Sequence, residues 1–130
     1  MKVRDLNNQW VHWKISGSVI TTVKSQYHEL ARLLLKQTYP TTPILEEVSI
    51  PVRQFQTLYL DFYIPLHQMA IEVHGEQHFT YIRHFHGNYM GYLKQKTRDN
   101  NKIEWCKLNN INLVVLKYNE DKDEWLRKIK

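Results

Sequence analysis

The sequence contains a single cysteine and no long apolar run. Cys106 stands alone among the 130 residues, which excludes an internal disulfide and a CxxC zinc cage. No stretch reaches the roughly 18 apolar residues that identify a transmembrane helix. The start, MKVRDLNNQW, is not typical of a secretory signal peptide. We therefore expect a cytoplasmic protein without membrane contact, in which any metal ion is held by oxygen or imidazole.

The composition predicts one folded domain with a basic surface. Hydrophobic residues make up 42% and aromatic residues 12% of the chain, which is too many for a disordered protein. The 18 Lys and Arg outnumber the 13 Asp and Glu and give a net charge of +5. This charge favours a polyanionic partner such as nucleic acid. A basic surface that only keeps the protein in solution explains the charge equally well.

The apolar pattern predicts a helix, three strands, a second helix and a fourth strand. Residues 1–24 are interpreted as an N-terminal arm or a small hairpin, and residues 25–130 as a single domain. Ser25 is suited to cap the first helix, which ends before Pro40. The charged residues after 118 are interpreted as a tail. The expected elements after the first helix are strands at 44–50, 56–64 and 68–75, a helix from about 92 to 109, and a strand at 111–118.

Two acids, Asp61 and Glu72, lie within the apolar strands 56–64 and 68–75. The short connection between these strands predicts an antiparallel hairpin. A symmetric connection places Asp61 directly opposite Glu72, where like charges repel each other. The same register places six apolar residues on the other face, namely Leu60, Phe62, Ile64, Met69, Ile71 and Val73.

Such a pair of acids is expected to bind a cation. Carboxylate oxygens completed by water are a usual environment for Mg²⁺ or Mn²⁺. Three other arrangements would explain the pair without a metal. One acid could form an ion pair with a lysine, the two could share a proton, or both could lie on an exposed face of the sheet.

Further polar groups could belong to the same site. His74 and His78 flank the turn at Gly75, where they could act as general bases or as donors to a phosphate. Glu29 lies one position off the apolar stripe of the first helix, so it could face either the sheet or solvent. Asp99 lies three residues before a lysine on the second helix, where an ordinary ion pair is the default interpretation.

The motifs ILEEVSIP, LYLDFYIP, IEVHGEQH and QKTRDNNKIEWCKLNNINLVVL together resemble the PD-(D/E)XK nuclease superfamily. The resemblance is strongest to the branch of very short patch repair endonucleases and phage-type EDxHD homing endonucleases, and it covers about residues 25–118. It implies an α/β fold with a restriction-endonuclease-like core, in which a mixed central β-sheet is flanked by helices. It also implies an Mg²⁺- or Mn²⁺-dependent endonuclease acting on double-stranded DNA, as homing or mobile-element nucleases do. A phage-encoded enzyme of this kind would work in the cytoplasm of the host cell.

The resemblance also implies roles for individual residues. In the common pattern a lysine stands two residues after the second acid, but His74 occupies that place here. This departure indicates the histidine-using branch, in which a histidine after the glycine turn activates water. The implied metal ligands are Asp61 and Glu72. The implied catalytic residues are Asp61, Glu72, His74, His78, Glu29 and Asp99.

Basic side chains on the second helix are expected to follow the DNA backbone, with affinity that falls as salt increases. The expected nucleic-acid contacts are Lys94, Lys96, Arg98, Lys102 and Gln77. Sequence specificity would then come from loops, the N-terminal arm or a homodimer. The alternative function is a nuclease-like fold that has lost catalysis and binds DNA or a protein partner, because a fold alone does not determine activity.

Overall fold

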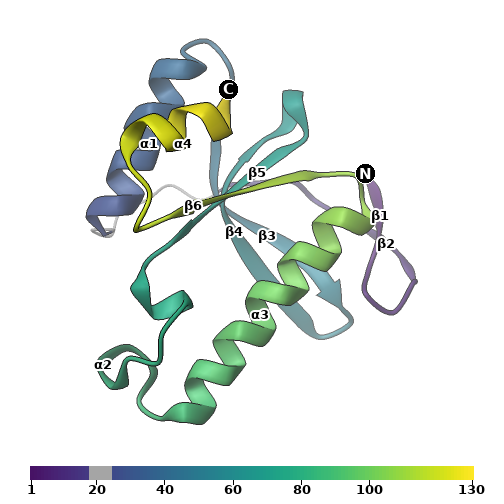
Figure 1. The fold of residues 1–130 in the computed structure, drawn as a ribbon. Helices are drawn as coiled ribbons and strands as arrows, with labels where there is room; N and C mark the ends of the chain where they lie inside the picture. The colour runs from purple at the N-terminus through teal and green to yellow at the C-terminus, as the bar shows by residue number, and fades with distance from the viewer. Residues whose placement is uncertain (18–24) are drawn as a thin grey trace.

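A four-stranded mixed sheet forms the centre of the molecule, with the strand order β3-β4-β5-β6 (Figure 1). The computed structural model describes residues 1–17 and 25–130, apart from the side chains of Gln77, His84 and Phe85. Strands β3 (Leu45–Arg53), β4 (Gln56–Ile64) and β5 (Met69–His74) pair in antiparallel fashion, and β6 (Asn112–Lys117) runs parallel to β5. The predicted α/β class with a mixed central sheet is therefore confirmed.

Helices cover both faces of this sheet. Helices α1 (Gln26–Thr38) and α4 (Lys122–Ile129) pack on one face, and α3 (Tyr89–Leu108) packs on the other. A short helix, α2 (Arg83–His86), precedes α3. Within the described residues, no helix combines the length and the apolar character needed to cross a membrane.

The N-terminal residues form a hairpin of β1 (Lys2–Arg4) and β2 (Trp10–His12). Val3 and Trp13 are each 2% exposed and belong to the core on the α3 side of the sheet. The hairpin therefore packs against the sheet as part of this core. The remainder of the predicted arm, residues 18–24, lies outside the described part of the chain.

The helix ends agree with the capping signals in the sequence, with one element missed. Ser25 caps α1 by accepting a hydrogen bond from the amide of His28 at 3.2 Å.

The residues interpreted as a charged tail form α4, so that prediction was wrong. The reason is that Trp125 and Ile129, four residues apart, bury one face of a short helix whose other residues are charged.

The predicted register of the β4–β5 hairpin is confirmed for the three pairs nearest the turn. Phe62 pairs with Ile71, and the two following pairs in the ladder keep the same register. The prediction that Leu60 shares a face with Phe62 was wrong. Leu60 belongs to the core that contains Trp105 of α3, whereas Phe62 belongs to the core formed with α1 and α4.

Leu60 and Phe62 face opposite sides of the sheet because of a local irregularity in the neighbouring strand β3. Glu47 of β3 has a left-handed backbone with a φ of 51°, and the β3–β4 pairs on either side of it keep one register. Between the Val48–Leu60 pair and the Glu46–Phe62 pair, the alternation of side chains therefore reverses in both strands. We call this point the reversal. It lies at Glu47 and Asp61, so the sheet is irregular where the first predicted acid stands.

Candidate active site between β4 and β5

The two acids take the place of backbone pairing between β4 and β5. The ladder between these strands ends at Phe62 and Ile71. Beyond that pair, the amide of Asp61 donates to Oε2 of Glu72 at 2.7 Å, and the amide of Val73 donates to Oδ2 of Asp61 at 2.8 Å. Beyond the end of the ladder, the amides of Asp61 and Val73 would have no partner in the facing strand. Each carboxylate therefore supplies an acceptor for one of these amides. The predicted opposition of Asp61 and Glu72 is present in this form.

Glu72 is the more deeply buried acid and forms an ion pair with Lys102 of α3. The carboxylate is 2% exposed, and the ammonium of Lys102 lies 2.8 Å from its Oε1. Burial alone would raise the pKa of Glu72, but His74 and the ammonium of Lys102 outweigh it and lower that pKa. Burial opposes the charge on Lys102 as well, yet its pKa is raised by Glu72. Glu72 is therefore the charged member of the acid pair.

Asp61 has no comparable cation beside it. Burial and the adjacent charge of Glu72 raise the pKa of Asp61 to about 8. Glu47 adds to this effect, and the more distant Lys102 reduces it only in part. Asp61 is consequently protonated at neutral pH unless a cation binds beside it.

Two histidines stack directly beyond the acids. The rings of His74 and His78 lie 4.1 Å apart between centroids and are parallel within 5°. His74 is 7% exposed, and its Nε2 has no hydrogen-bond partner among the described residues. That nitrogen lies 3.8 Å from Oε1 of Glu72, which is too far for a hydrogen bond.

His78 is held by Asp99 of α3. Its Nδ1 lies 2.9 Å from Oδ2 of Asp99, and the side-chain amide nitrogen of Gln95 lies 3.1 Å from its Nε2 and 3.3 Å from its Nδ1. The proton positions follow from the neighbours, because the amide of Ile82 can only donate to Nδ1 of His86. Nε2 of His86 then donates to Oε1 of Gln95, whose amide nitrogen donates to His78.

The carboxylate of Asp99 indicates the tautomer of His78. An ionised carboxylate can only accept, so the proton of the neutral ring is on Nδ1 and is donated to Asp99, which leaves Nε2 as the basic nitrogen. A basic nitrogen oriented by a carboxylate on its other side is the arrangement of a general base. Asp99 is therefore brought to His78 and does not form the helix ion pair with Lys102.

The acids border a pocket of about 210 Å³ that suits a hard cation. The wall of this pocket contains carboxylates from three strands, and Lys102 compensates the charge of Asp61 only in part when it ionises. The donors near Asp61 therefore fit Mg²⁺ or Mn²⁺. The lining residues are Ser25, His28, Glu47, Asp61, Glu72, Val73, His78 and Lys102.

His74, His78 and Asp99 form a second candidate set of metal ligands. Their ligand atoms lie within 4.8 Å of one another. A metal ion binds near the plane of an imidazole ring, and two parallel stacked rings have no common plane. One ring would have to rotate before both histidines could hold the same ion. The oxygen site at Asp61 needs no such rearrangement.

Two residues, Glu29 and Lys102, do not lie where their predicted roles require. Glu29 is half exposed and pairs with Arg32, which in turn contacts Glu46, so Glu29 is not among the residues around the acid pair. Lys102 was predicted to follow DNA on the helix surface, and that prediction was wrong. Its side chain is only 16% exposed because it reaches inward to Glu72.

The other predicted DNA contacts lie on the outer part of α3. Lys94 and Arg98 are exposed and line a groove of about 390 Å³ shared with Gln56 of β4. Lys96 is partly covered, with its ammonium 5.3 Å from the ring of Phe79. The side chain of Gln77 lies outside the described part of the structure.

Sequence reasoning missed several residues around the site, among them Gln95 and Glu47. Gln95 lies four residues before Asp99 and so shares its face of α3, a signal that the helical periodicity already contained. Glu47 carried no signal, because a glutamate in an ordinary strand pattern does not reveal a left-handed backbone.

Comparison with known proteins assigns no family. The chain is 36% identical over 61 residues to uncharacterized protein 307L of Invertebrate iridescent virus 6. The match covers 47% of this chain and 31% of the viral protein, so the chain spans less than a third of that relative. No family model and no solved structure matches the chain. The function is therefore argued from the geometry of the site.

Proposed function

We propose that this protein is a metal-dependent endonuclease that hydrolyses phosphodiester bonds in double-stranded DNA on a restriction-endonuclease-like core. The supporting observation is the position of Asp61, a carboxylate whose pKa is raised to about 8 beside a pocket that contains a second, charged acid. Perturbed titratable groups that meet in a pocket are typical of active sites. The net charge of +5 is consistent with a polyanionic substrate.

Different residues would hold the metal ion and activate the attacking water. Asp61 and Glu72 would hold Mg²⁺, which supplies charge neutralisation at the phosphate when it is bound. His78 takes a proton from the attacking water at Nε2, and Asp99 stabilises the resulting imidazolium through Nδ1. The water oxygen bonds to phosphorus as the bond from phosphorus to one sugar oxygen breaks, and that leaving oxygen takes up a proton from solvent. Gln95 must release Nε2 before this step, because its amide nitrogen occupies that position.

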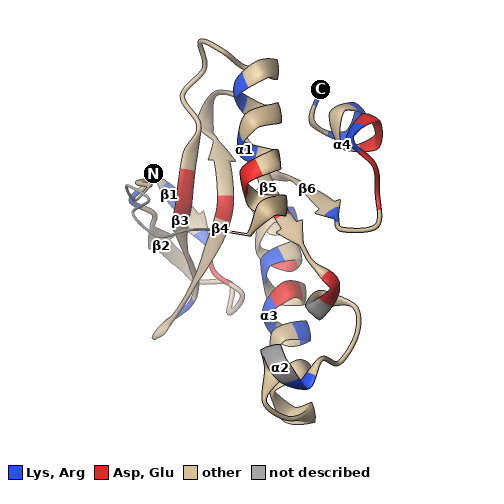
Figure 2. Ribbon diagram, turned by 90° about the vertical axis from the view of Figure 1, so that its left-hand side faces the viewer, with Lys and Arg blue, Asp and Glu red and all other residues tan. Residues whose placement is uncertain are grey.

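The arrangement of charge supports DNA as the substrate. Figure 2 shows acidic positions midway along β3 and β4, and basic and acidic positions alternating along α3. Lys94 and Arg98 are exposed on α3 beside the groove shared with β4, at positions close in sequence to Asp99. Phosphates that contact these two cations would approach the acids from that side.

A second candidate function is a nuclease-like fold that binds DNA or a protein without cleaving it. Two contacts favour this alternative. Lys102 already neutralises Glu72, and Gln95 already occupies the basic nitrogen of His78. In a protein that has lost catalysis, neighbouring side chains would be expected to occupy the former catalytic groups in this way.

Cleavage of supercoiled plasmid distinguishes the two functions. We expect wild-type protein to nick or linearise plasmid in Mg²⁺ or Mn²⁺ and to be inactive in EDTA. Asp61→Asn should reduce cleavage by more than about 100-fold, because even the partners of metal ligands contribute roughly 10- to 100-fold.

The matched control is Glu104→Gln, which removes an exposed acid from α3 and should leave cleavage unchanged. DNA binding by Asp61→Asn, measured by fluorescence anisotropy, should be retained. Binding by the wild type without metal-stimulated cleavage would establish the second candidate instead.

A further inference from the structure

Phe55 combines two unfavourable features at the tip of the β3–β4 hairpin. Its side chain is 99% exposed, the most of any large hydrophobic residue in the described part of the chain. Its backbone is left-handed, with a φ of 66°, in a region that bulky residues rarely adopt. Glycine or asparagine would satisfy this turn without strain. Strained positions that persist are frequently found at ligand sites.

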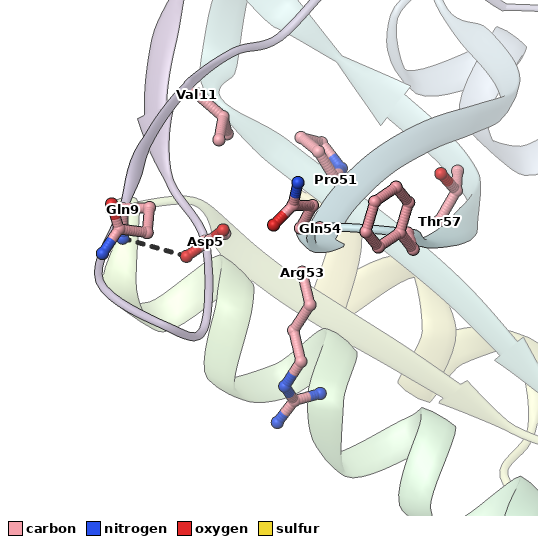
Figure 3. A pocket seen from close by; sticks show the side chains of 8 residues that line it. Asp5, Gln9, Val11, Pro51, Arg53, Gln54 and Thr57 are labelled. Carbon is pink, nitrogen blue, oxygen red and sulfur yellow. Dashed lines mark hydrogen bonds between the residues drawn. The ribbon is translucent and has the colours of Figure 1, made fainter.

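Phe55 lines a pocket of about 450 Å³ between the two hairpins of the protein (Figure 3). One wall is the N-terminal hairpin, with Gln9 and Val11, and the other is the tip of the β3–β4 hairpin, with Gln54 and Thr57. In Figure 3 the carboxamide of Gln54 lies between Gln9 and Thr57. The volume is within the range of small-molecule sites, about 300–1,000 Å³.

Hydrogen bonds already hold the walls of this pocket in place. Oδ1 of Asp5 accepts from the amides of Asn7 and Gln9, both at 2.9 Å, and so fixes the turn that carries Gln9. The amide of Leu6 donates to the carbonyl of Val52 at 2.7 Å and joins the two hairpins. These bonds hold the backbone of both walls in place.

The chemistry of the lining suits a nucleobase. An aromatic face stacks on any base, and a glutamine carboxamide can donate and accept along a base edge. Among the described residues of the lining, Asp5 is the only acid, and its Oδ1 accepts from two backbone amides. Arg53 also lines the pocket, and its Nη1 donates at 3.0 Å to Oε1 of Gln56, a residue of the groove that contains Lys94 and Arg98. Backbone phosphates could follow these cations while one base enters the pocket.

We propose that this pocket binds one unpaired nucleobase, stacked on Phe55, with its edge on the carboxamides of Gln9 and Gln54. The inference deepens the proposed function and rests on it for the identity of the substrate as DNA. The pocket is separate from the acid pair. Phe55 precedes Asp61 by six positions along β4, which corresponds to about 20 Å in an extended strand.

The test compares two DNA duplexes that differ in one unpaired 2-aminopurine. Binding is measured by fluorescence anisotropy in EDTA, in an Asp61→Asn background, so that the result does not depend on cleavage. We expect Asp61→Asn protein to prefer the duplex with the unpaired base by roughly 5- to 150-fold, the value of one stacked base. Adding Phe55→Ala should abolish this preference and leave affinity for the paired duplex unchanged, whereas Phe55→Trp should retain the preference.

The matched control is Leu66→Ala, which removes another exposed apolar side chain, 73% exposed, from the turn at the opposite end of β4. It should retain the preference. Equal affinity for the two duplexes, or the same preference in Phe55→Ala and Leu66→Ala, would overturn the inference and leave the tip as a contact for a protein partner. Plasmid cleavage by Phe55→Ala is scored separately, so a failure of the proposed function is distinguishable from a failure of this inference.

Discussion

Asp61 and Glu72 are both acids in strands of one hairpin, but their neighbours give them different charges. Lys102 lies 2.8 Å from Glu72 and keeps it ionised, whereas burial beside that charge raises the pKa of Asp61 to about 8. The metal-free site therefore holds a proton where the metal-bound site would hold a cation. Under the proposed function, a proton and a metal ion would compete for Asp61, and metal binding would depend on pH.

The pH dependence of stability should follow from Asp61. The folded protein keeps a proton that an unfolded chain releases above its ordinary pKa of 3.8. The stability contributed by this proton is therefore complete below pH 3.8 and is lost as pH rises to about 8. Asp61→Asn cannot ionise, so we expect its free energy of unfolding without metal to exceed that of the wild type increasingly up to pH 8.

Urea unfolding at a series of pH values, in EDTA, measures this difference. Adding Mg²⁺ should stabilise the wild type, more strongly at pH 8 than at pH 6, and should leave Asp61→Asn nearly unaffected. A difference between the two proteins that is independent of pH would contradict the assignment of the proton to Asp61.

Removing the ammonium of Lys102 should destabilise the fold. Lys102→Met leaves the carboxylate of Glu72 buried without its cation, a change that typically costs about 3–5 kcal/mol. The double variant Lys102→Met/Glu72→Gln should recover much of this loss, because no buried charge then remains. Lys107→Met, on the exposed surface of α3, is the matched control and should change the free energy of unfolding by less than about 0.5 kcal/mol. Equal effects of the two lysine variants in urea unfolding would show that Lys102 is a surface residue.

The sequence predicts some residues of this site and not others for a physical reason. The opposition of Asp61 and Glu72 depends on one short connection, so local geometry determines it. The contact between Lys102 and Glu72 depends on the packing of α3 against the sheet, and no local rule specifies that distance. The exposure of Glu29 likewise depends on its pairing with Arg32.

At the scale of elements, strong apolar runs predict the sheet well, and weakly apolar segments mislead. The strand β6 is recognisable because its apolar residues are nearly continuous. The helix α4 was not recognised because most of its residues are charged, although Asp121 caps it and Trp125 and Ile129 face the core. The reversal at Glu47 could not be predicted, since strict alternation is the only rule available for a strand.

The tip of the β3–β4 hairpin should be more stable without its aromatic residue. Phe55→Gly removes the strain of a left-handed backbone and loses almost no packing, because the side chain is 99% exposed. We expect the free energy of unfolding to rise by about 0.5–1 kcal/mol. Leu66→Gly is the matched control with the opposite sign, since Leu66 has no positive φ and glycine there costs about 0.5–1 kcal/mol. A lower stability for Phe55→Gly in urea unfolding would show that this turn is not strained.

At the scale of the whole molecule, the sheet separates two cores that differ in composition. The core on the α3 side contains Trp13 and Trp105, which stack edge to face at 5.1 Å, together with the N-terminal hairpin. The core on the other side is formed by α1 and α4 with mainly aliphatic residues and Trp125. The strand β4 serves both cores, with Leu58 and Leu60 in the core on the α3 side and Phe62 and Ile64 in the other, whereas the buried apolar residues of β3 all belong to the core on the α3 side.

Because of the reversal, we expect the two cores to unfold together. In a sheet with strict alternation, each strand presents one row of side chains to each side, and one layer of helices could loosen while the sheet remained intact. Here the tip half of β4 packs into the α3 layer, whereas its base half contributes Tyr63 to that layer and Phe62 and Ile64 to the other, so detaching either layer disrupts a strand on which the other layer depends. Amide protons along the whole hairpin should therefore exchange with deuterium only through global opening, with a single protection energy near the full free energy of unfolding. Two distinct protection levels on either side of Asp61 would show that the layers open independently.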